Sequence, residues 1–302
     1  MISKDQVKEY NEKGYLVLEN FLPNKILYEL QKTTDDFVEQ SRSITENDNI
    51  FDLSDSHTSK NPSVRRLKAP NEIHECYNRI IRNPIITDVV SKLIGQNLRL
   101  EHTKLNFKQA KGGEAIEWHQ DWAFYPHTND DLLEVGIFLD DCGLENGPLT
   151  IVPSSHKGPI DDHHHNGYFI GAVDPKKSNY DLALAEPIIA SAGSISLHHV
   201  RCLHGSRKNN SDKSRRVFFI GYCAADAWPL RGILDTGIKP DATEGDFVKN
   251  VYEIFKQKMI KGKPTLTARV ENNPVIMPYP PPPSVGSIYE NQKEVLGRSF
   301  GE

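Results

Sequence analysis

Hydrophobic and polar residues follow two different patterns along the chain, and the change falls near residue 97. Before it, apolar spacing and capping signals favour helices over residues 4–13, 24–40 and 85–93. After it, short apolar or alternating runs are separated by Gly, Pro and Asn turns, which is typical of an all-β sandwich or barrel. The sequence therefore predicts a helical N-terminal region followed by a strand-rich body.

The ends of the predicted helices carry recognisable signals. Ser3 and Gln6 have the spacing of a capping box, and Gly14 can end the helix that follows. Pro84 suits the first position of a later helix, and Gly95 suits its end. A short strand is expected between the first two helices, over residues 15–20.

Strands are expected in the second part of the chain, over residues 98–107, 116–122, 134–141, 149–152, 195–199 and 216–224. We expect one domain with three regions: helical support in 1–96, a β core in 97–225 with an insertion at 158–190, and a C-terminal lid in 226–302. The polar residues 41–68 are expected to form a mobile loop, and the Pro-rich tail at 278–283 an extended segment.

Composition narrows the class of protein without identifying it. The chain has 302 residues, of which 37% are hydrophobic and 25% charged, with a net charge of -5. This mild charge gives no reason to expect nucleic acid or a membrane surface as a partner, and no apolar run reaches the ~20 residues of a membrane helix. Four scattered cysteines form no C-x-x-C pair. We expect a cytoplasmic protein whose cysteines are reduced thiols, and the oligomeric state stays open.

The most specific chemical signal is His119-Gln120-Asp121 with the distant His204. Two histidines and one carboxylate form the facial triad that binds non-haem Fe(II) and leaves positions open for chemistry. On a strand, His119 and Asp121 share a face, and His204 must come from another strand. Arg215 follows it and can clamp a dicarboxylate bidentately. Together these residues suggest an iron oxygenase that uses 2-oxoglutarate.

A His-x-Asp pair alone is common by chance in a chain with 12 histidines. The ordered context makes it specific, and over residues 4–225 the chain resembles the phytanoyl-CoA dioxygenase family of Fe(II)/2-oxoglutarate oxygenases. The motifs that carry the resemblance are Gly14 to Leu22, Trp118-His119-Gln120-Asp121-Trp122, Glu145-Asn146-Gly147-Pro148-Leu149, Pro153-Ser154-Ser155-His156-Lys157-Gly158, His204-Gly205-Ser206 and Arg215.

The resemblance implies a fold and a set of roles. The fold is a double-stranded β-helix, a cupin-like jelly roll of two sheets flanked by helices. The implied Fe(II) ligands and catalytic residues are His119, Asp121 and His204. The implied contacts to the cosubstrate 2-oxoglutarate are Arg215, Ser206 and, more weakly, Asn106. O2 is the oxidant.

The implied reaction is hydroxylation of an unactivated C–H bond in a small-molecule substrate, with release of succinate and CO2. Related halogenases lack the carboxylate ligand, so its presence here as Asp121 favours hydroxylation. Two alternatives stay open. The same iron-based oxidation can end in desaturation, epoxidation or ring rearrangement, as in secondary metabolism, or the chain can be a catalytically inactive jelly-roll binding protein.

Substrate contacts are less clear than the iron ligands. Phe124 and Tyr125 follow the triad, and Trp228 and Arg231 follow the last predicted strand, so these four are candidates for the substrate pocket. Aromatic core packing is an equally good explanation for the rings. The three histidines at 163–165 are best explained as a solvated loop tip, with a substrate lid as the alternative.

Overall fold

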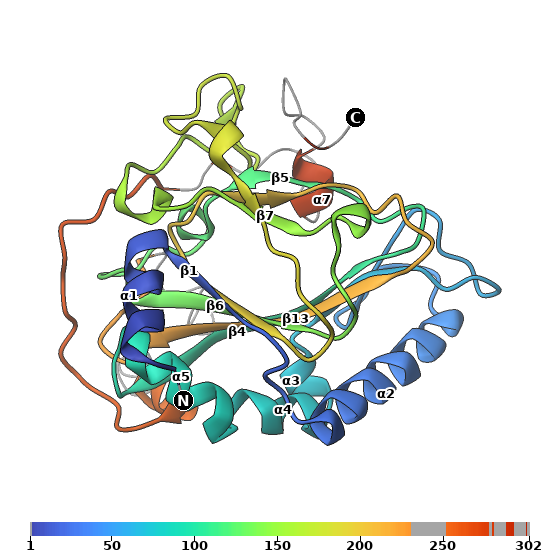
Figure 1. Ribbon diagram of the computed structural model, residues 1–302, viewed down its shortest axis with the longest axis horizontal. Helices are drawn as coiled ribbons and strands as arrows, with labels where there is room; N and C mark the ends of the chain where they lie inside the picture. Colours follow the sequence, from blue (N-terminus) through green and yellow to red (C-terminus); the bar gives the residue numbers. More distant parts are fainter. Residues whose placement is uncertain (1, 231–251, 278–279, 281–287, 293–299, 301–302) are drawn as a thin grey trace, which may run out of the picture.

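Two antiparallel sheets face each other, and helices cover the outer side of the larger sheet (Figure 1). The structure is a computed structural model and describes residues 2–230, 252–277, 280, 288–292 and 300. The strand order is β1-β11-β6-β13-β4-β3-β2 in the larger sheet, with β14 paired to β4, and β10-β7-β12-β5 in the smaller one. This is the mainly β double-stranded β-helix that the sequence predicts.

The strands of the larger sheet are β1 (Tyr15–Leu18), β2 (Phe51–Leu53), β3 (Val64–Lys68), β4 (Leu98–Lys108), β6 (Leu132–Phe138), β11 (Ile195–His199), β13 (Arg215–Ala224) and β14 (Met259–Lys261). Those of the smaller sheet are β5 (Ile116–His119), β7 (Leu149–Ile151), β10 (Glu186–Pro187) and β12 (His204–Ser206). A separate hairpin pairs β8 (His164–His165) with β9 (Tyr168–Phe169).

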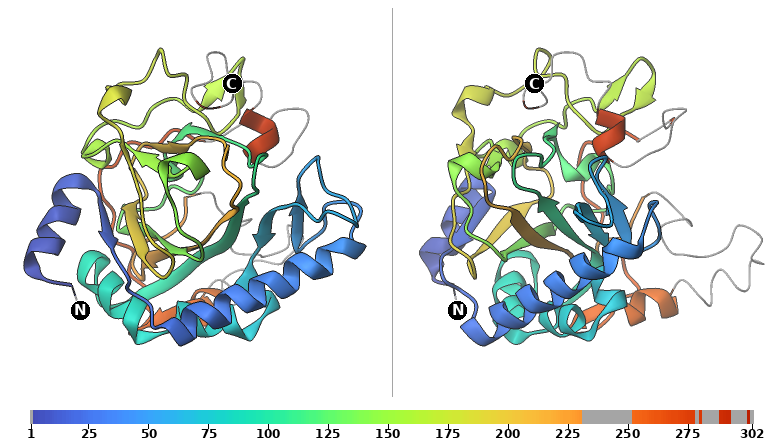
Figure 2. Two further views of the ribbon diagram at one scale, coloured as in Figure 1. Left: turned by 45° about the vertical axis from the view of Figure 1, so that its right-hand side comes forward. Right: turned by 90° about the vertical axis from the view of Figure 1, so that its right-hand side faces the viewer.

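The helices are α1 (Lys4–Lys13), α2 (Asn24–Gln40), α3 (Pro70–Ile73), α4 (Glu75–Ile81), α5 (Pro84–Ile94) and α7 (Ile288–Asn291). Helices α2 to α5 lie under the larger sheet, whereas α7 lies near β5 on the opposite side of the molecule (Figures 1 and 2). Each helix in the described part of the chain is too short or too polar to span a bilayer.

Local sequence explains where the helices begin and end. Ser3 and Gln6 form the predicted capping box of α1, and Gly14 ends that helix with φ 84°. This left-handed backbone is easy for glycine and costly for other residues. In α5, Asn83 caps the helix by accepting a hydrogen bond from the Ile85 N–H, with Pro84 following as the first helical residue.

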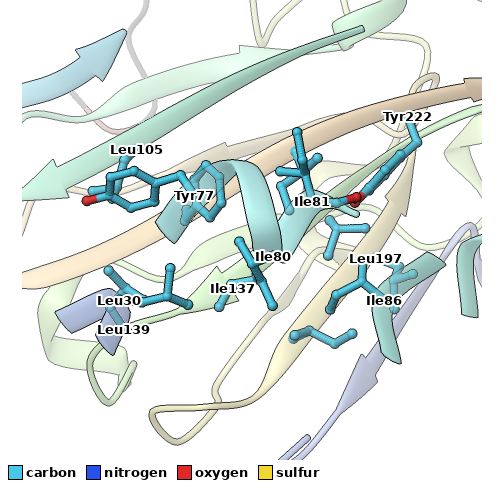
Figure 3. Close-up of a cluster of buried hydrophobic side chains, with 14 of the residues drawn as sticks. Leu30, Tyr77, Ile80, Ile81, Ile86, Leu105, Ile137, Leu139, Leu197 and Tyr222 are labelled. Carbon is cyan, nitrogen blue, oxygen red and sulfur yellow. The ribbon is translucent and has the colours of Figure 1, made fainter. Parts of the chain in front are cut away.

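The main hydrophobic core fills the space between the larger sheet and its helices (Figure 3). Tyr77 and Ile81 from α4 and Leu30 from α2 are fully buried there. They pack over Leu105 and Tyr222 of the central strands β4 and β13. Burying a large apolar side chain contributes roughly 1.5–3 kcal/mol, so this layer fixes the sheet whose other face lines the site.

The N-terminal loop prediction is wrong in part. Residues 41–68 contain β2 and β3, which extend the larger sheet at its β4 edge. Three of the five residues of β3 are charged, Arg65, Arg66 and Lys68, so its sequence looks like a polar loop. Arg66 pairs in register with Asn106 of β4, and its side chain therefore faces the inner space between the sheets. The predicted Pro-rich tail at 278–283 lies almost wholly outside the described residues.

Candidate active site

The three predicted iron ligands come together between the two sheets. His119 ends β5, and His204 begins β12 directly opposite it in the smaller sheet. Asp121 opens a 3-10 turn, and its carboxylate oxygens lie 3.8 Å from His119 Nε2 and 3.9 Å from His204 Nε2. One ligand-type atom from each residue lies within 4.8 Å of the others. This spacing suits a single metal ion.

A turn, rather than strand alternation, brings the carboxylate to the histidine. The sequence predicts a strand over residues 116–122, but β5 ends at His119 and Asp121 is in a 3-10 turn. The side chain of Gln120 between them is completely buried and donates a hydrogen bond to the Arg201 carbonyl at 2.9 Å. This anchor draws the chain away from the sheet and returns Asp121 towards His119.

Both histidines present a free Nε2 to the site. The Nδ1 of His119 donates to the Glu117 carbonyl at 2.8 Å, and that of His204 donates to the Cys202 carbonyl at 2.9 Å. Because a carbonyl can only accept, the proton sits on Nδ1 and the Nε2 lone pair is available to a metal. Burial lowers the pKa of His119 and, more strongly, that of His204. Both rings are therefore neutral, as ligation requires.

The carboxylate of Asp121 is held in its ionised form. Burial by itself raises its pKa, but the charge of Lys104 and the contacts of His204, His198 and His119 outweigh burial and hold the pKa well below its usual range. The Nε2 of His198 lies 3.3 Å from Asp121 Oδ2 and donates to it. Neutral imidazoles around an ionised carboxylate form a donor set that fits Fe(II).

The triad opens into a cavity of about 290 Å³ between the sheets. Five other residues that the sequence singles out line this cavity: Asn106, Phe124, Tyr125, Ser206 and Arg215. Trp228 is not among its lining residues, and its ring instead packs on Phe255 at 4.4 Å between centroids. Arg231 lies outside the described residues.

One end of the cavity holds two buried basic side chains that have no anionic partner among the described residues. Arg215 and Lys108 are each 4% exposed, and neither forms an ion pair among the described residues. Arg215 donates to the Gly147 carbonyl, its Nε has no partner, and Lys108 donates to carbonyls such as that of Glu114. Burial lowers the pKa of both groups.

Buried charge without a partner is costly, so this end is built to receive an anion. A dicarboxylate can place its far carboxylate on the guanidinium of Arg215 bidentately while its other end reaches the triad. The residues present therefore fit 2-oxoglutarate as well as iron.

The lining of the cavity includes a second polar cluster that the sequence did not reveal. The Oε1 of Glu134 lies 3.0 Å from His102 Nε2 and accepts from the Tyr125 hydroxyl at 3.0 Å. Lys104, on β4, also lines the cavity, is half-buried and forms no ion pair or hydrogen bond within the described residues. Its ammonium group lies 5.7 Å from the centre of the Phe219 ring and has no ionic partner among the described residues.

Helix α7 closes part of the cavity from a segment far along the chain. Ile288 and Tyr289 line the cavity, and Tyr289 is 5% exposed. The guanidinium groups of Arg65 and Arg66 lie 5.5 Å and 5.4 Å from the centre of its ring. Gln292 ties the segment down through hydrogen bonds to backbone groups of the smaller-sheet region.

Sequence reasoning missed these lining residues for different reasons. Lys104 and Lys108 are two residues either side of Asn106, so strand alternation alone places all three on one face. Glu134 and His198 lie opposite each other on β6 and β11, a pairing that no local pattern shows. Nothing near Tyr289 signals that it returns to the site.

The prediction for the histidine run is wrong at His163. This residue is 2% exposed, and its Nε2 accepts a hydrogen bond from the Gln120 N–H at 2.8 Å. Its Nδ1 donates to the Asp161 carbonyl. His164 and His165 form the short strand β8 and are half-buried. His163 therefore supports the turn that carries Asp121 rather than forming a solvated tip.

Comparison with known proteins agrees with this geometry. The family model of phytanoyl-CoA dioxygenase (PhyH) matches residues 10–217. The "probable alpha-ketoglutarate-dependent hypophosphite dioxygenase" of Stutzerimonas stutzeri is 34% identical over 98% of this chain and 99% of its own length. The L-proline trans-4-hydroxylase of Streptomyces griseoviridis is 31% identical over 53% of this chain and 67% of its own length.

Solved structures show the same fold. EctD from S. alaskensis with bound Fe has a TM-score of 0.63 at 22% identity, covering 74% of this chain and 77% of that one. The same protein with 2-oxoglutarate and 5-hydroxyectoine has a TM-score of 0.62, with the same identity and coverage. The chain therefore belongs to the phytanoyl-CoA dioxygenase family and is an iron- and 2-oxoglutarate-dependent dioxygenase.

Proposed function

We propose that this dioxygenase oxidises a small anionic substrate, and that hypophosphite is the first candidate. The observation that carries the proposal is the ammonium group of Lys104, which faces the cavity beside the triad without an ionic partner among the described residues. The relative that aligns over 98% of the chain is named for hypophosphite. A small oxyanion suits a cavity of about 290 Å³ that must also hold 2-oxoglutarate.

In this proposal His119, Asp121 and His204 hold the iron and serve as the catalytic centre. Iron held by these residues would supply the chemistry that couples the decarboxylation of 2-oxoglutarate to the activation of O2. The protein keeps both imidazoles neutral with Nε2 towards the metal, through the Nδ1 bonds to backbone carbonyls. His198 orients the carboxylate of Asp121 by donating to its second oxygen.

The cosubstrate is assigned to the end of the cavity with the two buried cations. Arg215 pairs with the far carboxylate of 2-oxoglutarate, and the adjacent Lys108 lines the same end of the cavity. Ser206 and Asn106 line the same cavity as hydrogen-bonding groups. Binding neutralises cations that are otherwise buried without a counter-charge, and Tyr289 helps to exclude water from the pair.

The substrate is assigned to the wall formed by Lys104, His102 and Tyr125. The ammonium group of Lys104 pairs with the anionic substrate and positions the P–H bond of hypophosphite beside the triad. The rings of Phe124 and Phe219 complete the wall and limit the size of the substrate. A C–H bond of a small amino acid is the second candidate, because a proline hydroxylase is also among the relatives. The carboxylate of the amino acid would pair with the same ammonium group of Lys104.

Product analysis tests the proposal directly. The iron-loaded enzyme is supplied with 2-oxoglutarate, O2 and hypophosphite, and succinate and phosphite are followed by NMR. We expect phosphite and succinate in equal amounts, a raised KM for hypophosphite in Lys104→Met, and no turnover in His204→Ala. L-proline and ectoine serve as C–H comparators. Phosphite formation with an unchanged KM in Lys104→Met, or hydroxyproline without phosphite, would contradict the substrate assignment.

Ligand binding tests the residue roles independently of the substrate. Anaerobic addition of Fe(II) and 2-oxoglutarate to the metal-free protein should give a visible charge-transfer band. The band should be absent in His204→Ala and weakened in Arg215→Ala. A full band in either variant would show that the cofactors bind elsewhere.

A further inference from the structure

A second group of metal-binding side chains lies away from the triad. Glu101 of β4, Cys223 of β13 and His127, in the loop before β6, each bring one ligand-type atom within 4.8 Å of the others. The side chains of His127 and Cys223 are fully buried, and that of Glu101 is 19% exposed. None of the three lines the cofactor cavity.

A β-bulge directs the carboxylate into this group. The register between β4 and β13 pairs His102 with Gly221 and Leu100 with Tyr222, which leaves Glu101 as the extra residue. Bulges re-aim the side chain of the unpaired residue. Here the bulge turns Glu101 towards Cys223, which follows the same irregularity on β13.

The imidazole of His127 is arranged like those of the triad. Its Nδ1 donates to the Tyr125 carbonyl at 2.9 Å, the same contact to residue i−2 that His119 and His204 make. His163 shares this contact, but its Nε2 is satisfied by the Gln120 N–H. The buried Nε2 of His127 makes no hydrogen bond within the described residues.

We propose that Glu101, His127 and Cys223 bind a Zn²⁺ ion. His127 Nε2 and Glu101 Oε2 are 3.4 Å apart, long for a charge-assisted hydrogen bond and close to the edge of a tetrahedron of ligands that lie about 2.0–2.2 Å from zinc. Thiolate, imidazole and carboxylate are all zinc ligands, and the thiolate distinguishes this site from the nitrogen and oxygen donors of the triad.

Binding displaces the proton of the Cys223 thiol to solvent, since only the thiolate ligates. No short hydrogen bond holds this proton in the protein, because the contact of the thiol to the Arg99 carbonyl is 3.6 Å long and its other described partner is His127, a ligand of the same site. The partly exposed side of Glu101 leaves the fourth position to water. The ion would join the bulge of β4, the end of β13 and the loop that carries Tyr125 on the cavity wall.

Cobalt substitution distinguishes this site from the triad, because Cys223 gives this site a sulfur ligand and the triad has none. The full chain is purified without a metal-chelating tag in a His204→Ala background, freed of metal and titrated with Co²⁺. We expect a thiolate-to-cobalt charge-transfer band, and one zinc ion per chain after reconstitution with Zn²⁺. Cys223→Ser should abolish the band, whereas Cys142→Ser, another buried cysteine, should keep it.

Further variants separate a metal site from an ion pair. Glu101→Gln should lower the affinity for zinc and leave the thiolate band intact at saturating Co²⁺, so the result does not depend on Cys223→Ser folding. A natively folded protein with no band at saturating Co²⁺ would overturn the proposal and leave a buried His127–Glu101 ion pair. A band that persists in Cys223→Ser, or is lost in Cys142→Ser, would overturn it too.

Discussion

At the scale of single residues, the site depends on buried groups whose charge is set by what lies next to them. Neutral imidazoles face an ionised Asp121 because burial acts on the rings while Lys104 and the histidines act on the carboxylate. His198 belongs to this arrangement although it follows no motif. It fixes the second oxygen of Asp121 through one hydrogen bond of 3.3 Å.

Replacing His198 by Phe should weaken Fe(II) binding by about 10–100-fold, because outer hydrogen bonds of this kind orient a metal ligand. His198→Gln keeps an N–H donor and should bind Fe(II) nearly as well as the wild type. Anaerobic Fe(II) titration of both variants provides the measurement. Equal losses in the two would show that the ring packs in the core and does not orient Asp121.

The buried His163 should make stability depend on pH. Burial lowers its pKa from 6.5 to about 3. Between these two pH values the His163 ring is therefore neutral in the folded chain and protonated in the unfolded chain. The free energy of unfolding therefore has its full value above pH 6.5. It falls as the pH drops from 6.5 towards 3, and this group contributes up to about 1.4 kcal/mol per pH unit to the fall. His163→Gln should show a shallower acid slope in urea unfolding. An unchanged slope would mean that His163 is protonated in the folded chain.

At the scale of elements, each sheet contributes a different half of the site. The smaller sheet carries His119 and His204 at the facing ends of β5 and β12. The larger sheet carries Arg215 at the start of β13 and Lys104 on β4. Helix α7 then covers the space between them with Tyr289, although it lies outside the 10–217 segment that matches the family.

Tyr289→Ala should weaken 2-oxoglutarate binding by about tenfold, or roughly 1.4 kcal/mol. The ring shields the cationic end of the cavity, and water admitted there would screen the pairing of Arg215 with a carboxylate. Tyr28→Ala on α2 is the control, because Tyr28 is 67% exposed. Anaerobic titration of the iron-loaded proteins gives both dissociation constants. Equal dissociation constants for the two variants would show that α7 takes no part in 2-oxoglutarate binding.

The sequence predicts the elements that depend on local pattern and misses those that depend on pairing. Alternation and turn residues locate β4, β11 and β13 closely, and capping signals locate α1 and α5. β3 was missed because two of its charged residues are taken up inside the fold, Arg66 by the cavity and Arg65 by an ion pair with Asp52. The triad was found through a short motif, yet its reason was wrong at Asp121, because a turn held by Gln120 replaces the strand.

At the scale of the whole molecule, the fold buries basic side chains that have no counter-charge within the described residues. The helices and the core under the larger sheet provide the stability that permits this (Figure 3). On its other face Arg215 and Lys108 are buried without a described ionic partner. Proteins commonly give up stability at such functional sites, and ligands that bind only the folded chain restore it.

Arg215→Met should therefore stabilise the metal-free protein while removing its response to 2-oxoglutarate. Met keeps most of the volume and removes a buried charge without a partner, a change we expect to gain about 1–3 kcal/mol. Arg216→Met is the matched control, because Arg216 pairs with Asp140 and Asp35 and its loss should lower Tm. Thermal unfolding with and without Fe(II) and 2-oxoglutarate measures both effects. A lowered Tm of the metal-free protein in Arg215→Met, as in Arg216→Met, would contradict this expectation. It would show that the charge of Arg215 is already compensated and that the residue is structural, because removing an uncompensated buried charge should not destabilise the folded protein.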